Sequence, residues 1–342
     1  MLRWDVDGGR AVAEARRTRV TSTDVARASG FSRQLVGFVL NNTPGQTIPE
    51  TTRAKVLRAA AELGYVPHGP AQALRRGRGR TVLLALPDLP QGPTIADLIE
   101  SLADALVAEG LTLVTYLLGA EQRSPREVAA VLAPVAVAGM LPFSESDIAT
   151  FRASGAAVVL PQPGTAFGSN LDESMRLLGE MQVDYLVGRG HRRIAFAAPD
   201  DARTATLASG RYDGARMAGE RHGLPPVRRY LVSSDGADEA VAALRSGRHP
   251  VTAVACHGDE VAFAVLAAAR SAGLRVPDDL AVMGADELPI ARYASPPLTS
   301  IAVDGRAAGL VLARTLVDLL ADRTPPPFDY HDGIRVVPRE SA

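Results

Sequence analysis

From Thr81 onward, short apolar runs alternate with longer amphipathic stretches, and this alternation limits the possible fold more than any other feature of the chain. Apolar runs of roughly 4–8 residues bounded by turn formers predict buried strands, and the stretches between them have helical spacing. Strands that alternate with helices form parallel sheets covered on both faces, so the pattern predicts a doubly wound α/β fold. The expected strands are 82–86, 111–117, 135–141, 156–160, 193–198, 251–255 and 280–284.

Glycine recurs where the helical stretches end. Gly110, Gly223 and Gly273 each stand just before a strand or loop. Because glycine adopts the left-handed conformation of a helix C-terminus without steric cost, we predict that each of them ends a helix. The region after residue 80 is large for one sheet core, so we expect two sub-domains with a ligand-binding cleft at the carboxyl ends of their strands.

The N-terminal part has the pattern of short, capped helices. Residues 21–24 have the Ser/Thr-x-x-Asp/Glu form of a capping box, and the helix that they open is expected to end at Gly30. Ser32 then stands at the N-cap of a second expected helix over 33–40.

A third helix completes this part of the chain. Pro49 suits the first residue of a helix that runs to about residue 63. Short helices joined by a turn that holds a glycine predict an all-α helix-turn-helix domain over 19–66. The side chains expected to face its core are Leu35, Val36, Val39 and Leu40 in the second helix and Val56, Leu57 and Ala60 in the third.

Charge is divided unevenly along the chain. Residues 1–80 hold 14 Lys and Arg side chains against 6 Asp and Glu, although the net charge of the whole chain is −1. A basic N-terminal part on an acidic remainder points to a polyanion as the partner of that part. Residues 1–18 show no periodicity and are predicted to be a disordered tail, and 67–80 have the composition of a linker.

Several classes of protein are disfavoured. Cys256 is the single cysteine, so no intrachain disulfide and no cysteine-based zinc site can form. No signal-like or membrane-spanning apolar stretch is present, and we expect a soluble, cytoplasmic protein with no membrane partner. The segment 257–260 (HGDE) lacks a second histidine at ligand spacing, and no nucleophile elbow or phosphate-binding glycine motif occurs. We therefore expect no enzyme activity, no metal and no cofactor.

Residues 20–41 (VTSTDVARASGFSRQLVGFVLN) resemble the DNA-reading segment of the LacI/GalR family of bacterial transcription regulators. Further motifs resemble the same family in the same order: AELGYVP (61–67), GHRRIAF (190–196), GLRVPDD (273–279), MGAD (283–286) and PPLT (296–299). The resemblance spans about 19–340. It implies a periplasmic-binding-protein-like core over 81–342, with an N-sub-domain of about 81–187 plus 303–328 and a C-sub-domain of about 188–302 plus 329–340.

The resemblance also implies a function. Proteins of this family are homodimers that bind a pseudo-palindromic DNA operator, mostly as repressors, and a small-molecule effector changes their affinity as an inducer or a corepressor. One short reading helix contacts few base pairs, so specificity requires two half-sites read by a two-fold dimer. The effector expected here is sugar-like or another polar metabolite. The alternative is a sugar-binding protein of the periplasmic-receptor type without a role on DNA, which would not need residues 19–66.

Carried onto this chain, the resemblance places base readout in the second helix. Arg33 suits guanine and Gln34 suits adenine, each contributing about 1–3 kcal/mol of discrimination. Phe38 stands where relatives often have a basic residue, and it either contacts a thymine methyl or packs against the third helix, which we favour. Ser32 binds phosphate or only caps the helix. The remaining expected contacts are phosphate contacts from Thr21, Asn41, Thr52 and Arg53 and, in a hinge helix over 70–75, a minor-groove wedge from Leu74 with Ala71 against its partner.

The effector residues are also implied by the resemblance. Arg211 and Asp286 match a basic and an acidic residue that commonly bind effector hydroxyls, and the alternative is a structural salt bridge. Asp172 and Asp259 match further contacts, but each could instead cap a helix, one beginning near residue 173 and the other over 260–270. Thr94 lies in 92–95 (GPTI), where relatives often have aromatic residues that stack on a ring.

Overall fold

The computed structural model describes residues 20–41, 43, 45–65, 79–88, 92–118, 124–161, 166–233, 235–326 and 333–342. The predicted tail, and most of the linker with Ala71 and Leu74, lie outside these residues. The chain divides into two compact units, which we call the head (Met1–Gly79) and the body (Arg80–Ala342).

The described part of the head contains the three expected helices: α1 (Ser22–Ser29), α2 (Arg33–Leu40) and α3 (Glu50–Glu62). The capping box at Thr21 is present with both of its hydrogen bonds, and Gly30 ends α1 with a φ of 75°. The N-cap of α3 is Pro49, one residue before the helix rather than its first residue.

The core of the head is formed by valines and alanines from all three helices. Its fully buried members are Val25, Val36, Val39, Val56, Ala59 and Ala60. The prediction that Leu57 faces this core was wrong, because Leu57 is 47% exposed. A helix turns by about 100° per residue, and with Val56, Ala59 and Ala60 directed inward the next position after Val56 points outward.

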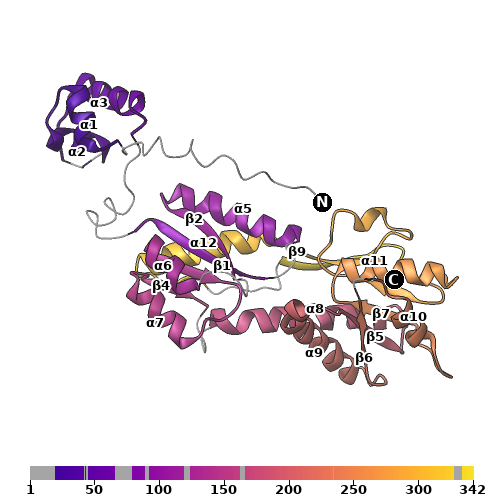
Figure 1. Cartoon of the computed structure of the whole chain (residues 1–342). Coiled ribbons are helices and arrows are strands. Elements are labelled where there is room, and N and C mark those ends of the chain that lie inside the picture. The colour runs from indigo at the N-terminus through magenta and orange to yellow at the C-terminus, as the bar shows by residue number, and fades with distance from the viewer. Residues whose placement is uncertain are drawn as a thin grey trace, which may run out of the picture. The chain divides into compact units, whose positions relative to one another are not determined.

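The body contains two four-stranded parallel sheets, which confirms the predicted doubly wound α/β fold. The first sheet has the strand order β2-β1-β3-β4. Helices α5 and α12 pack on one of its faces and helices α6 and α7 on the other, as the two apolar clusters show (Figure 1). The bounds are β1 (Thr81–Pro87), β2 (Thr112–Leu118), β3 (Ala136–Gly139), β4 (Val158–Leu160), α5 (Pro93–Ala108), α6 (Pro125–Leu132), α7 (Glu145–Ala153) and α12 (Gly305–Leu320).

The second sheet has the order β6-β5-β7-β8 and repeats this arrangement. Helices α8 and α9 cover one face and α10 and α11 the other. The bounds are β5 (Ile194–Pro199), β6 (Arg228–Val232), β7 (Ala253–Cys256), β8 (Ala281–Met283), α8 (Ala166–Gly188), α9 (Ala205–Arg221), α10 (Asp238–Arg245) and α11 (Asp259–Ser271), with short 3-10 turns η1 (Ala202–Thr204) and η2 (Ala291–Tyr293). Strands β9 (Ser300–Val303) and β10 (Ile334–Val337) form a separate antiparallel pair.

Every apolar run predicted as a strand contains one, and Gly110, Gly223 and Gly273 all have positive φ. The sequence did not predict β6, β9 or β10. Strand β6 lies at a sheet edge and is mostly exposed, so it has no continuous apolar run. The short pair of β9 and β10 joins segments about 30 residues apart, a long-range pairing that local periodicity cannot show.

Helices α8 and α9 pack with their backbones in direct contact. A Cβ atom on Gly179 would overlap the carbonyl oxygen of Arg211, and one on Gly214 would overlap the carbonyl oxygen of Arg176. Only glycine allows such an approach, because any side chain would push the helices apart. The two glycines therefore determine where α9 lies on α8.

We predict that Gly214→Ala lowers the free energy of unfolding by about 1–3 kcal/mol or more, because the added methyl group has no space. The matched control is Gly188→Ala at the end of α8, where a Cβ would meet no atom within 4 Å. This control should be neutral or gain roughly 0.4–1 kcal/mol from reduced unfolded-state entropy. Urea unfolding followed by circular dichroism measures both, and equal midpoints for the two variants would contradict the close contact.

Candidate functional site

The first turn of α2 presents polar side chains to solvent. The Ser32 hydroxyl accepts a hydrogen bond from the backbone N–H of Leu35 at 3.2 Å, so the predicted N-cap is present. Arg33 and Gln34 are exposed, while Val36 on the opposite face is buried. The sequence thus builds a helix with one face fixed in the core and its N-terminal residues directed outward.

The expected phosphate-contacting residues lie at helix ends, where several also stabilise the backbone. The Thr21 hydroxyl donates to Asp24 at 2.7 Å within the capping box. The Asn41 side-chain amide donates to the carbonyl of Gly37 at 2.7 Å at the end of α2. Thr52 and Arg53 lie half-buried in the first turn of α3.

Phe38 is half-buried in the head. It is not among the side chains that form the core cluster of the described residues there.

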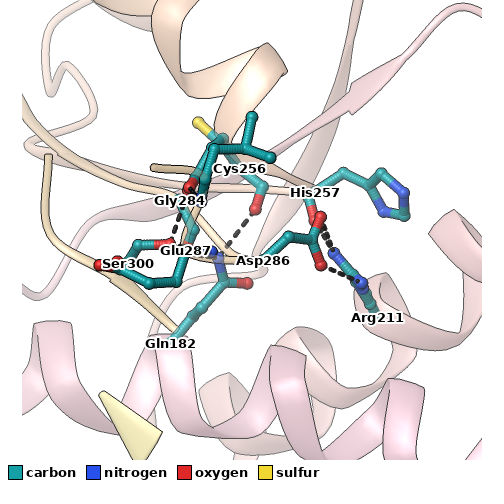
Figure 2. A network of polar contacts seen from close by, with 10 residues as sticks. Gln182, Arg211, Cys256, His257, Gly284, Asp286, Glu287 and Ser300 are labelled. Carbon is teal, nitrogen blue, oxygen red and sulfur yellow. Dashed lines mark hydrogen bonds and ion pairs between the residues drawn. The ribbon is translucent and has the colours of Figure 1, made fainter. Parts of the chain in front are cut away.

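In the body, Arg211 and Asp286 form an ion pair at one end of the second sheet. Nη2 of Arg211 lies 2.9 Å from Oδ1 of Asp286, and Nη1 donates to the backbone carbonyl of His257. The Arg211 side chain comes from α9 and is 8% exposed, whereas that of Asp286 is 35% exposed. His257 follows β7 and Asp286 follows β8, so both acceptors lie at carboxyl ends of neighbouring parallel strands (Figure 2).

The loop after β8 has an unusual backbone. Asp286 and Glu287 have φ values of 90° and 48°, a backbone conformation that residues other than glycine rarely adopt. Such residues cost on the order of 1–3 kcal/mol each and persist only where surrounding contacts hold them. Here the N–H of Asp286 donates to the carbonyl of Ile301, the N–H of Glu287 donates to the Ser300 hydroxyl, and Arg339 pairs with the Glu287 carboxylate.

His257 is neutral in this site. Burial lowers the pKa of His257 to about 3, and the charge of Arg211 acts in the same direction. Its Nδ1 atom is buried without a hydrogen-bond partner among the described residues. The described residues contain no group of three or more His, Cys, Asp and Glu side chains that could hold a metal ion.

Asp259 has a different role from the predicted cap. It is the first residue of α11, its N-cap is Gly258, and no side-chain cap bond is made, so the capping interpretation was wrong. The carboxylate instead accepts hydrogen bonds from the N–H of Leu288 at 2.7 Å and the Ser300 hydroxyl at 2.6 Å. Asp259 therefore ties the loop after β8 and strand β9 to α11. Burial raises the pKa of Asp259 to about 7, and these two hydrogen bonds oppose the rise.

The two remaining predicted effector residues lie in helices α8 and α5. Asp172 lies inside α8, which begins at Ala166, so the interpretation of Asp172 as the cap of a helix starting near residue 173 was wrong. Thr94 is half-buried in the first turn of α5, beside the first sheet, and its carbonyl lies against Gly305 of α12. Of the predicted effector residues whose side chains the structure describes, Arg211, Asp286 and Asp259 gather at one end of the second sheet and Thr94 does not.

Sequence reasoning missed Gln182 and Ser300. Both are completely buried and polar. Gln182 donates to the carbonyls of Cys256 and Gly284, and the Ser300 hydroxyl accepts from the N–H of Glu287 and donates to Asp259. For Gln182 the available signal was an amide among the apolar residues of a long helix. Ser300 stood in no motif.

Comparison with known proteins agrees with both units. Residues 21–68 match the family described as bacterial regulatory proteins, lacI family. Residues 183–342 match the periplasmic binding protein-like domain. The chain thus combines a lacI-family helix-turn-helix domain with a periplasmic-binding-protein-like domain.

The chain aligns with its most similar relatives over nearly their whole length. The HTH-type transcriptional repressor PurR of Yersinia pestis bv. Antiqua (strain Antiqua) is 29% identical over 335 residues, which are 94% of this chain and 96% of the relative. PurR of Yersinia pseudotuberculosis serotype O:1b (strain IP 31758) gives the same identity and coverage.

Solved structures of LacI-family proteins share the fold. The lac repressor dimer bound to operator and the anti-inducer ONPF has a TM-score of 0.71 at 23% identity and covers 94% of this chain and 99% of its own. The complex of the transcriptional regulator CelR with cellobiose has a TM-score of 0.57 at 26% identity, covering 95% of this chain and 100% of its own.

The LacI-family relatives are transcriptional regulators and not enzymes, in agreement with the expectation from the sequence. The match over 21–68 favours a regulator over a receptor that binds only small molecules. None of the described helices is both long and apolar enough to cross a membrane.

Asp259 should make stability depend on pH. The folded protein keeps the carboxyl proton up to a pH of about 7, whereas an unperturbed carboxyl of this kind loses it near 3.8. Stability therefore falls as pH rises between these values and is constant above them. Asp259→Asn cannot ionise and should lose this dependence. Since one pKa unit corresponds to about 1.4 kcal/mol, its free energy of unfolding relative to wild type should shift in its favour by on the order of 2–4 kcal/mol as pH rises through this window, whatever the offset from the changed hydrogen bonds.

Urea unfolding at a series of pH values measures this difference. The control is Asp213→Asn, an exposed aspartate on α9, whose profile should follow that of wild type. Parallel curves for wild type and Asp259→Asn would contradict the raised pKa.

Proposed function

We propose that this protein is a sequence-specific transcription repressor of the cytoplasm. It binds a pseudo-palindromic operator as a homodimer, and a small-molecule effector in the body controls its affinity. The observation that carries the proposal is α2, which is capped by Ser32, packed through Val36 and presents Arg33 and Gln34 to solvent. The relatives named PurR are transcriptional repressors, and the lac repressor was solved as a dimer on its operator.

The chemistry of the head supports contact with DNA. Arg33 can bind the O6 and N7 atoms of guanine through two hydrogen bonds, and Gln34 can bind adenine in the same manner. The excess of basic over acidic side chains in residues 1–80 favours the phosphate backbone. Thr21, Ser32, Asn41, Thr52 and Arg53 are the proposed phosphate contacts, and Leu74 with Ala71 the proposed hinge contacts.

The Arg211–Asp286 pair supports an uncharged effector. The guanidinium charge is already balanced by Asp286, and the second charged pair nearby, Glu287 with Arg339, is balanced as well. An anionic ligand would face Asp286 without a surplus positive charge, whereas hydroxyl groups can both donate to the carboxylate and accept from the guanidinium. We therefore propose a neutral metabolite with several hydroxyl groups, bound at Arg211 and Asp286.

Asp259, Asp172 and Thr94 have weaker support as effector contacts. Asp259 is buried and its carboxylate accepts two hydrogen bonds, which suits a residue that orients the loop before Asp286 contacts a ligand.

An effector can change operator affinity only if it binds two arrangements of the body with different affinities.

Footprinting of the purified protein on DNA upstream of its own gene and the neighbouring genes tests the regulator proposal. We expect a protected site with two-fold symmetry, and binding that weakens steeply as salt rises. Arg33→Ala should weaken operator binding by about 1–3 kcal/mol and relax preference at one base in each half-site. The control Arg27→Ala, an exposed residue of α1, should leave base preference unchanged. The absence of any protected site would overturn the proposal.

The effector class is tested by thermal-shift screening with free sugars and nucleosides and, separately, their phosphate esters. We expect at least one neutral compound to raise the melting temperature of wild type. Asp286→Asn should abolish this shift and keep operator binding, because asparagine tolerates the positive φ at this position. Asp213→Asn is the control and should respond as wild type. A response to phosphate esters only would contradict the neutral class, and a retained shift in Asp286→Asn would remove this residue from the site.

A further inference from the structure

Gln182 joins helix α8 to two strands of the second sheet. Its side chain is completely buried. Nε2 donates one hydrogen bond to the carbonyl of Cys256 at 2.8 Å and a second to the carbonyl of Gly284 at 3.0 Å. Figure 2 shows the amide reaching from α8 to these two carbonyls side by side. Both N–H groups of one amide are thus used on segments that are far apart in the chain.

The two carbonyls lie where the pairing of β7 with β8 stops. The last paired residues are Ala255 and Met283, and Cys256 and Gly284 follow them directly. Beyond this point the strand ladder ends, and a backbone hydrogen bond from the N–H of Asp259 to the carbonyl of Ala285 links the two segments again further on. Gln182 bridges them at this position.

The bridged positions are next to both acceptors of Arg211. His257, whose carbonyl accepts from Arg211, follows Cys256 in the chain, and Asp286 lies two residues after Gly284. The spacing between these acceptors determines whether one guanidinium can reach both. By linking the carbonyls of Cys256 and Gly284, the Gln182 amide therefore also fixes the distance between the two groups that accept hydrogen bonds from Arg211.

The remaining atom of the amide shows that this arrangement carries a cost. Oε1 of Gln182 is buried with no hydrogen-bond partner among the described residues. A buried acceptor without a partner costs about 1–3 kcal/mol, and an apolar side chain at this position would avoid it. Packing alone therefore does not account for glutamine here, whereas its two donors do.

Helix α8 also contacts the backbone of Arg211. Gly179 lies three residues before Gln182 and packs against the carbonyl of Arg211. The same helix thus locates the backbone of Arg211 and the strand ends that its side chain reaches. Helix α8 is in addition the segment of chain between β4 of the first sheet and β5 of the second.

We propose that Gln182 is a positioning residue of the effector site. Its amide holds the loops after β7 and β8 at the spacing that Arg211 requires, and it links any movement of these loops to α8, which leads to the other sheet. The inference rests on the proposed function for its consequence, the response to effector. The positioning itself is a property of the protein without DNA or ligand.

The test is hydrogen–deuterium exchange of the full chain, without DNA or ligand, for wild type and Gln182→Met. Methionine has a similar length and no donor, so both bridging bonds are lost. We expect the backbone amides of Asp259, Gly284, Asp286 and Leu288 to exchange about three- to thirtyfold faster, as the loss of roughly one to two hydrogen bonds implies. The two loops should change together, and β5 should not.

The control is Val183→Ala, a change at the neighbouring buried residue of α8 that removes packing but no hydrogen bond. It should raise exchange evenly across the second sheet, with no excess in the two loops. If Gln182→Met does not fold, Gln182→His, which keeps one ring N–H donor, gives the same comparison with a smaller effect. Unchanged exchange in the two loops, or a rise no different from that in Val183→Ala, would overturn the proposal.

This experiment is independent of the regulator proposal. A protein that protects no DNA site would overturn the proposed function and leave the exchange result standing. A protein that binds its operator but shows no selective change in the loops would overturn only the role of Gln182.

Discussion

The backbones of α8 and α9 touch at Gly179 and Gly214, and the geometry of the candidate effector site depends on this contact. The main-chain carbonyl of Arg211 is part of the contact, so its side chain starts from a fixed point. The conformational entropy of the Arg211 backbone is lost when the two helices pack, so ordering of the guanidinium costs only side-chain freedom. The guanidinium can then reach His257 and Asp286 without rearrangement of α9.

The loops after β7 and β8 contain strained backbone and unpaired polar atoms, and hydrogen bonds from other elements offset the free energy that these cost. Two residues after β8 have left-handed backbone conformations, and three buried polar atoms, on Gln182, Arg211 and His257, have no partner among the described residues. Asp259, Ser300 and Gln182 hold the same loops through hydrogen bonds from different elements. Strain and unpaired polar groups of this kind concentrate at binding sites, because a site must be held ready for a ligand rather than relaxed without it.

Local chemistry explains which parts could be predicted. Thr21 and Ser32 cap the starts of α1 and α2, and Gly30 ends α1. These signals could be read from the sequence because an N-cap or a left-handed glycine contacts only residues a few positions away in the chain. Buried strands appeared as apolar runs because both faces of a parallel sheet are covered. Leu57 was misplaced because a third helix with few large apolar residues gives a weak periodic signal. The Asp259 and Asp172 caps failed because a carboxylate near a helix start does not show where the helix starts.

The sequence by itself determined the class of each unit, the helices of the head, three helix C-termini of the body and the uneven division of charge behind a net charge of −1. Through its resemblance to the LacI family it also marked Arg211 and Asp286. Only the tertiary structure decided that these two residues pair with each other, that Asp259 fastens a loop, and that Gln182 bridges β7 to β8. Apolar periodicity and helix capping depend only on residues that are close together in the sequence. Hydrogen bonds between segments 29 to 102 residues apart exist only after packing has brought those segments together.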